Sequence, residues 1–92
     1  MVSTPEIRVD CPEEIKFKIA QEAQSAFKEF KVETIDGVRV TFDKGWGLVR
    51  ASNTQPVLVM RFEATTPELL EQYKKTVIDR IEDIKARLSK AA

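Results

Sequence analysis

Apolar and polar residues alternate in several short stretches of the chain, and this pattern predicts β-strands. In the first stretch, Ile7, Val9 and Cys11 fall on one side of an extended backbone, as in a strand with one buried face. The dipeptide Asp36-Gly37 favours a tight turn between two such stretches, and a second turn is expected at Asp43-Lys44-Gly45. The predicted strands are residues 6–11, 32–35, 38–42, 46–50 and 57–64.

Two other stretches repeat apolar residues at spacings of three and four, which predicts amphipathic helices. The first helix is expected to begin at Pro12-Glu13-Glu14, because proline and acidic side chains suit a first helical turn. The second is expected to begin at Thr65-Thr66-Pro67-Glu68, where a hydroxyl cap precedes the proline. The core-facing residues would be Ile15, Ile19, Ala23, Ala26 or Phe27, and Phe30 in the first helix, and Leu70, Tyr73, Val77, Ile81, Ile84 and Leu88 in the second.

The other positions of the two helices are mostly polar, and these are expected to face solvent. Phe17 lies outside the apolar stripe, so we expect it to pack beside a neighbouring element or against another domain. For the second helix a coiled-coil dimer is the alternative, but Leu69 and Ile78 widen its stripe and favour packing on a sheet. The solvent-facing residues of the first helix would be Lys16, Lys18, Glu22, Gln24, Lys28 and Glu29.

The order of elements is strand, helix, several strands and helix, without alternating parallel units. This order predicts an α+β two-layer sandwich, in which a four-stranded antiparallel sheet carries both helices on one face. A chain of 92 residues can form one such core but is too small to enclose a full catalytic cleft. We expect residues 1–4 to be a disordered or artificial start, residues 5–89 the folded domain, and residues 90–92 a frayed tail.

Charge and cysteine content exclude several classes of protein. The chain has 15 Lys and Arg against 15 Asp and Glu, so no overall field favours nucleic acid or an anionic membrane. A single cysteine, Cys11, allows no internal disulfide, and without histidine there is no Cys/His metal cluster; a half-buried thiol near a strand end is expected. No apolar run reaches the roughly 18 residues of a membrane span, and no signal peptide is present, so a cytoplasmic protein is expected.

The polar segment between residues 50 and 56 carries the candidate chemistry. Arg50 offers a planar five-donor guanidinium, and Ser52, Asn53 and Thr54 add two hydroxyls and an amide, which together suit an oxyanion. Pro56 has no N–H and would end the loop, leaving the backbone N–H groups of residues 51–55 to form an anion-binding nest. The alternative is an ordinary hairpin turn, because Ser, Asn and Thr are common turn formers.

Four strings of residues resemble the C-terminal, fourth domain of the α-D-phosphohexomutases, in particular the bacterial phosphomannomutase/phosphoglucomutase branch. The similarity covers nearly the whole chain and implies a fold similar to the TATA-binding-protein-like fold. It also implies that Arg50, Ser52, Asn53 and Thr54 bind the substrate phosphate that is not transferred, whereas Gln55 departs from the acidic residue or threonine common in relatives. The strings are Asp36-Gly37-Val38-Arg39, Gly45-Trp46-Gly47-Leu48-Val49-Arg50-Ala51-Ser52-Asn53-Thr54, Pro56-Val57-Leu58 and Phe62-Glu63-Ala64.

The resemblance further implies that the chain is part of a longer isomerase. Such an enzyme interconverts hexose 1-phosphate and 6-phosphate through a phosphoserine and a 1,6-bisphosphosugar. The nucleophilic serine, the magnesium ion and the loop for sugar preference would lie in three preceding domains. This chain would therefore contain no catalytic residue, metal ligand or cofactor, and alone it is expected to be inactive. Its expected partners are the hexose phosphate and the preceding domains, with neither nucleic acid nor membrane.

Two other functions fit parts of the pattern. A free-standing phosphometabolite-binding module would need only the segment from Arg50 to Thr54. A nucleic-acid or protein interaction domain is suggested by the fold analogy alone, and a fold does not fix a function. Balanced charge and strands without interleaved aromatic and basic residues argue against the nucleic-acid function.

Overall fold

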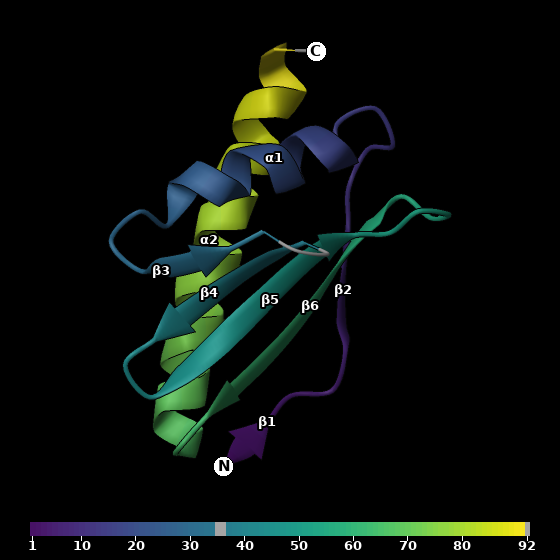
Figure 1. The fold of residues 1–92 in the computed structure, drawn as a ribbon. Coiled ribbons are helices and arrows are strands. Elements are labelled where there is room, and N and C mark those ends of the chain that lie inside the picture. Colours follow the sequence, from purple (N-terminus) through teal and green to yellow (C-terminus); the bar gives the residue numbers. More distant parts are fainter. Residues whose placement is uncertain (35–36, 92) are drawn as a thin grey trace.

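Two helices lie on one face of an antiparallel sheet in the computed structural model, which describes residues 1–34 and 37–91 (Figure 1). The predicted α+β two-layer sandwich is confirmed, and β4 and β6 have the bounds that the sequence pattern predicts. The elements are β1 (Val2–Ser3), β2 (Ile7–Asp10), α1 (Lys16–Ala26), β3 (Lys31–Glu33), β4 (Val38–Phe42), β5 (Gly45–Ala51), β6 (Val57–Ala64) and α2 (Pro67–Ala91).

The sheet has six strands in the described residues, so the predicted four-stranded sheet is wrong. All five strands predicted along the chain join it, and β1 is the additional strand. The strand order is β1-β6-β5-β4-β3, and β2 also pairs with β6. β1 and β2 lie along successive parts of β6, from Val2 opposite Ala64 to Asp10 opposite Val57. The start of the chain therefore covers the edge of β6, whose backbone N–H and C=O groups need partners. Pro5, which has no N–H, lies in the gap between these two short strands.

Both ends of the described chain contain regular structure. Val2–Ser3 form β1, within the stretch expected to be a disordered or artificial start, and α2 continues to Ala91. The predicted turn at Asp36-Gly37 lies partly outside the described residues, because Asp36 is not among them. Gly37 has a φ of 125°, in the left-handed region that favours glycine, as expected for a turn residue.

The hydrophobic core lies between the sheet and the two helices. Most of the residues that the helical spacing predicts as core are buried, and α2 contacts β5 and β6 through them. Core packing is thus confirmed for the α2 stripe. The N–H of Leu69 donates to the Thr66 hydroxyl at 3.2 Å, so the predicted cap of α2 is also confirmed. The buried stripe residues are Ile15, Ile19, Ala23, Phe27, Tyr73, Val77, Ile81 and Ile84.

The first helix begins later than predicted, at Lys16 rather than at Pro12. A turn precedes it, in which the N–H of Ile15 donates to the Pro12 carbonyl at 3.1 Å. Ile15 occupies the cap position and provides no side-chain hydrogen bond, so proline and two acids are not enough to extend the helix here. The helix ends at Ala26, which leaves Phe30 beyond it.

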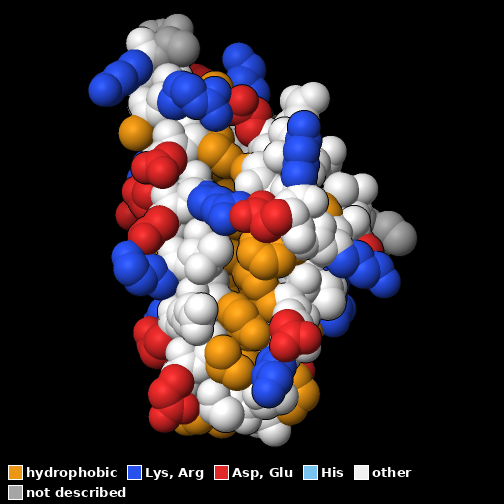
Figure 2. Space-filling model, turned by 90° about the vertical axis from the view of Figure 1, so that its left-hand side faces the viewer, with side chains coloured by type: hydrophobic (Ala, Val, Ile, Leu, Met, Phe, Trp, Pro, Cys, Tyr) orange, Lys and Arg blue, Asp and Glu red, His pale blue; other side chains and the backbone are white. Residues whose placement is uncertain are grey.

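Arg80 of α2 links the two helices at the end of α1. Its two terminal nitrogens donate to the Glu29 carboxylate at 2.9 and 2.6 Å, and one also donates to the Ala26 carbonyl at 2.9 Å. The guanidinium also lies 5.1 Å from the ring centroid of Phe27. Hydrogen bonding from Arg80 lowers the pKa of Glu29 to about 2. Figure 2 shows Lys, Arg, Asp and Glu side chains mixed on one face of the molecule.

We expect Glu29→Gln to lower the melting temperature at pH 7. Because the pKa of Glu29 falls from 4.5 to about 2 on folding, its contribution to stability is present above pH 4.5 and is lost as the pH falls toward 2. The melting difference between wild type and Glu29→Gln should therefore shrink from about pH 5 to about pH 2. Thermal melts monitored by circular dichroism measure this difference, with Glu14→Gln as the control. Equal melting temperatures at pH 7 would contradict it.

Candidate functional site

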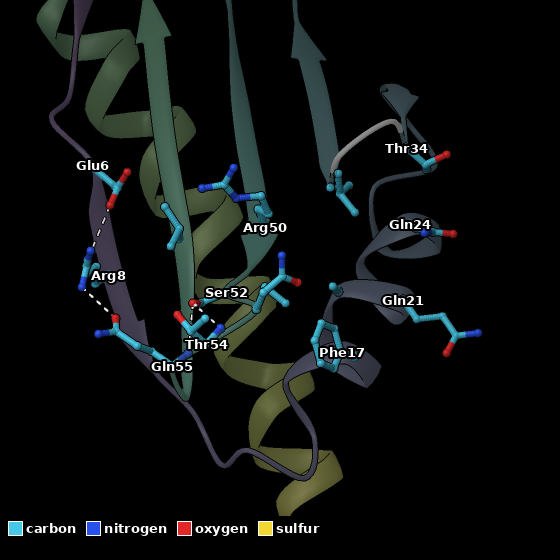
Figure 3. A pocket seen from close by; sticks show the side chains of 16 residues that line it. Glu6, Arg8, Phe17, Gln21, Gln24, Thr34, Arg50, Ser52, Thr54 and Gln55 are labelled. Atoms are coloured by element: carbon cyan, nitrogen blue, oxygen red, sulfur yellow. Dashed lines mark hydrogen bonds and ion pairs between the residues drawn. The ribbon is translucent and has the colours of Figure 1, made fainter.

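The four residues that the resemblance names lie together on the β5–β6 hairpin. Arg50 is exposed near the end of β5, Ser52 is half-buried, and Asn53 and Thr54 are exposed in the loop. All four line one open hollow of about 880 Å³. Figure 3 shows Arg50, Ser52 and Thr54 beside this hollow, with Phe17 of α1 across from the loop. The predicted strand, loop and strand are confirmed, and the loop positions all four side chains at one place.

The Ser52 hydroxyl organises the loop from within. Its oxygen accepts the N–H of Thr54 at 3.3 Å and the N–H of Gln55 at 3.2 Å. The N–H of Ser52 itself donates to the Val57 carbonyl at 3.0 Å. Three of the amides that the sequence suggested for an anion nest are therefore already used, and the predicted nest is wrong for them. The Ser52 hydroxyl takes the place of an anion at these amides because a serine side chain reaches the N–H groups two and three residues ahead of it.

Side-chain donors are consequently the main groups that this loop can offer to an anion, beside the N–H of Asn53, which donates to no described residue. Among the hydrogen bonds of residues 1–34 and 37–91, none uses the Arg50 guanidinium, the Asn53 amide or the Thr54 hydroxyl as a donor. The loop therefore combines a backbone held by three hydrogen bonds with three side chains whose donors are not engaged by described residues. A charged planar donor beside neutral donors is the chemistry that recognises phosphate or carboxylate oxygens.

A second arginine, Arg8, shares the hollow and was not singled out from the sequence. Arg8 and Arg50 are both register partners of Val59, from β2 and β5 on either side of β6, so their side chains lie on the same face of the sheet. The Arg8 guanidinium donates to the Gln55 side-chain oxygen at 2.9 Å and lies 3.5 Å from Glu6. The alternation of residues 6–11 indicates its face, but only the strand register brings it beside Arg50.

The prediction that the Lys16 side chain faces solvent is wrong. Its side chain is 0% exposed, and its ammonium nitrogen donates to the Gln55 carbonyl at 3.0 Å. A carboxylate oxygen of Glu13 lies 2.9 Å from the same nitrogen. The first turn of α1 thus contacts the far end of the loop. Helical spacing could not reveal this contact, because it depends on a carbonyl in a distant hairpin.

Phe17, the next residue of α1, forms part of the opposite side of the hollow. Its side chain is 57% exposed, which is unusual for a large apolar residue in a small domain. Gln21 and Gln24 of the same helix also line the hollow. Phe17 therefore lines the hollow beside the candidate loop but is not buried against it, so the expected packing beside a neighbouring element is not observed, and packing against another domain stays a prediction.

Cys11 and the acidic residues do not add a reactive or metal centre here. Cys11 is buried and free, and burial raises the pKa of its thiol, which disfavours the nucleophilic thiolate. In the described part of the chain, no group of three or more His, Cys, Asp or Glu side chains gathers that could hold a metal ion. The described residues therefore do not fit a magnesium ion. The described helices also include none long and apolar enough to cross a membrane.

Comparison with known proteins identifies the family. Residues 6–80 match the family described as phosphoglucomutase/phosphomannomutase, C-terminal domain. The chain is 47% identical over 89 residues to a phosphomannomutase/phosphoglucomutase of Pseudomonas aeruginosa, covering 95% of this chain and 19% of that protein. It is 55% identical over 73 residues to the same-named protein of Pseudomonas syringae pv. tomato, covering 77% of this chain and 16% of that protein.

Two further relatives agree with this assignment. A phosphoglucomutase of Neisseria meningitidis serogroup B is 44% identical over 85 residues, or 85% of this chain and 18% of that protein. The crystal structure of a phosphoglucomutase/phosphomannomutase family protein from Burkholderia thailandensis superposes with a TM-score of 0.75 at 36% identity, over 91% of this chain and 18% of that one. The chain spans less than a fifth of each of these relatives. It belongs to the family of phosphoglucomutase/phosphomannomutase C-terminal domains.

Proposed function

We propose that this chain is the substrate phosphate-binding domain of a phosphohexomutase that interconverts hexose 1-phosphate and hexose 6-phosphate. In this proposal Arg50, Ser52, Asn53 and Thr54 hold the phosphate that is not being transferred. The observation that carries it is their position on one hairpin loop, where all four line a single hollow. Family membership supports the reaction class, and the relatives that are named mutases are several times longer than this chain.

The role of the loop in such a reaction is electrostatic positioning. A guanidinium can bind two phosphate oxygens at once, and such charge-assisted contacts are about twice as strong as neutral ones. Holding the far phosphate fixes the sugar so that its near end meets the phosphoserine in another domain. When the bisphosphosugar intermediate reverses, the loop receives the other phosphate. It must therefore recognise phosphate itself rather than one end of the sugar.

The proposal assigns no bond-making residue to this chain. The phosphoserine and the magnesium ion, which would offset phosphate charge, belong to the preceding domains of the intact enzyme. The isolated chain is accordingly expected to bind phosphate but not to turn over a hexose phosphate. A free-standing phosphometabolite-binding module is the alternative with the same loop, and the coding sequence upstream of Met1 distinguishes the two.

We expect the isolated chain to bind inorganic phosphate and glucose 6-phosphate in the millimolar range or more weakly. One loop supplies about four ligands, and the water exclusion and contacts of the other domains are absent, so a binding free energy near −4 kcal/mol is about the ceiling. Titration of the ¹⁵N-labelled chain should shift the amides of residues 50–55 most, and Arg50→Ala should abolish these shifts. Shifts centred on α2 instead would remove the site assignment.

A further inference from the structure

Lys16 occupies an unusual environment for a charged residue. Among the buried residues of 1–34 and 37–91 it is the only charged one, and its side chain is 0% exposed. Ile15 and Ile19 beside it on the inner side of α1 are also buried. Its ammonium nitrogen has two oxygen partners, the Gln55 carbonyl at 3.0 Å and the Glu13 carboxylate at 2.9 Å.

Stability alone does not account for a lysine at this position. Moving an ammonium group out of water is costly, and attraction to a partner carboxylate often offsets only part of that cost. A methionine could fill the same volume and complete the apolar stripe of α1 without this cost. The specific property that lysine adds is a charged donor directed at one backbone carbonyl of the β5–β6 loop.

That carbonyl lies at the end of the loop, where two other backbone hydrogen bonds also hold the chain. Pro56 follows it and has no N–H to donate, although its own carbonyl accepts the N–H of Cys11 at 3.0 Å. The Gln55 carbonyl also accepts the N–H of Val57 at 2.8 Å. Without Lys16, the buried end of this peptide would lose its only charged donor among the described residues. Its C=O would then keep only the Val57 N–H as a partner, and the peptide would be less constrained against turning its oxygen toward the hollow, where it would repel an anion.

The same peptide unit is linked to the candidate ligands. The N–H of Gln55 donates to the Ser52 hydroxyl oxygen at 3.2 Å, and its side-chain oxygen accepts from Arg8 at 2.9 Å. Lys16 therefore fixes Gln55 from the core side, while Gln55 in turn orients Ser52. The Glu13 carboxylate, which is 60% exposed, offsets the charge of Lys16, so the lysine acts through the loop backbone and not as a distant attractor.

We propose that Lys16 is a positioning residue, whose buried ammonium group sets the loop shape in which the four ligand side chains receive phosphate. This inference rests on the proposed function. It assigns to the first turn of α1 a role in binding, although the Lys16 side chain is buried and separated from solvent.

Lys16→Met in the ¹⁵N-labelled chain tests the proposal, with Lys18→Met on the exposed side of the same helix as the matched control. Relative to wild type, Lys16→Met should raise the Kd for inorganic phosphate at least about fivefold and speed amide exchange at Ser52, Thr54 and Gln55 at least about tenfold. Its melting temperature should stay equal or rise, which a merely structural lysine would not give. Lys18→Met should match wild type in all three measurements.

The outcomes separate this inference from the proposed function. If phosphate shifts no amide of residues 50–55 in wild type, the proposed function fails and this inference fails with it. If wild type binds and Arg50→Ala does not, but Lys16→Met keeps the wild-type Kd, only this inference is overturned. Should Lys16→Met not fold, Lys16→Arg is measured instead. Faster amide exchange in the loop with an unchanged phosphate Kd overturns the inference, whereas faster exchange together with a higher Kd supports it.

Discussion

Replacing Arg50 with alanine in the full-length protein is expected to lower the kcat/KM of the proposed mutase reaction by about 30- to 150-fold, equivalent to roughly 2 to 3 kcal/mol. Under the proposed function, the change removes a charged, bidentate contact to the phosphate that orients the sugar, so the loss should appear in transition-state stabilisation. Melting should barely change, because Arg50 is exposed and has no place in the core. Steady-state kinetics with glucose 1-phosphate, together with a thermal melt, measure both quantities.

Other loop variants give this prediction its internal controls. Arg50→Lys should recover only part of the activity, because a point charge cannot replace the planar fork. Ser52→Ala should cost less than Arg50→Ala but more than Thr54→Ala, since the Ser52 oxygen also accepts two loop amides. Arg87 lies on the exposed face of α2 and is paired with Glu22 at 3.0 Å, so Arg87→Ala should leave kcat/KM unchanged. Full activity of Arg50→Ala at unchanged stability would show that Arg50 is an ordinary surface residue.

Phe62→Ala is expected to destabilise the domain by about 3 to 5 kcal/mol, a large share of the roughly 5 to 15 kcal/mol typical of a small domain. Phe62 is 0% exposed, and its register partner on β5 is Gly47. A Cβ built on Gly47 would lie 2.8 Å from the Phe62 ring, so the ring covers the glycine backbone. Removing the ring opens a cavity in the layer between sheet and helix that neighbouring side chains cannot fill.

Phe17→Ala is the matched control for this effect. The same side chain is removed, but Phe17 is 57% exposed, so the free energy of unfolding should change by less than about 0.5 kcal/mol. Urea unfolding followed by circular dichroism gives both values from the transition midpoints and slopes. Equal midpoints for Phe62→Ala and Phe17→Ala would contradict the location of the core.

Periodicity along the chain was sufficient to predict the layers of this fold. The alternation in residues 38–42 and the three-and-four spacing from Leu70 to Leu88 each correspond to an element with one buried face. Patterns of this kind report which face of an element is apolar, but not which neighbour pairs with it. The pairing of Val2–Ser3 with β6, and hence the number of strands, depends on edge hydrogen bonds that leave no hydrophobic signal.

The candidate site was predictable in its members and not in its internal bonding. Resemblance to the family named Arg50, Ser52, Asn53 and Thr54, and the hairpin brings them together. The hydrogen bonds from loop amides to the Ser52 hydroxyl depend on the local loop conformation. In that conformation the hydroxyl competes with any external anion for backbone donors. Burial of Lys16 depends on a carbonyl 39 residues away, so its place on a helical wheel gave the wrong environment.

The loop from Arg50 to Thr54 is proposed to hold the phosphate that is not transferred. Crystal structures of the full-length protein with glucose 1-phosphate and with glucose 6-phosphate would test this position. In each complex we expect a phosphate oxygen to lie about 2.7 to 3.1 Å from an Arg50 nitrogen and from the Ser52 or Thr54 hydroxyl. A phosphate bound elsewhere in both complexes, with this loop in contact only with water, would show that the loop is not the phosphate site.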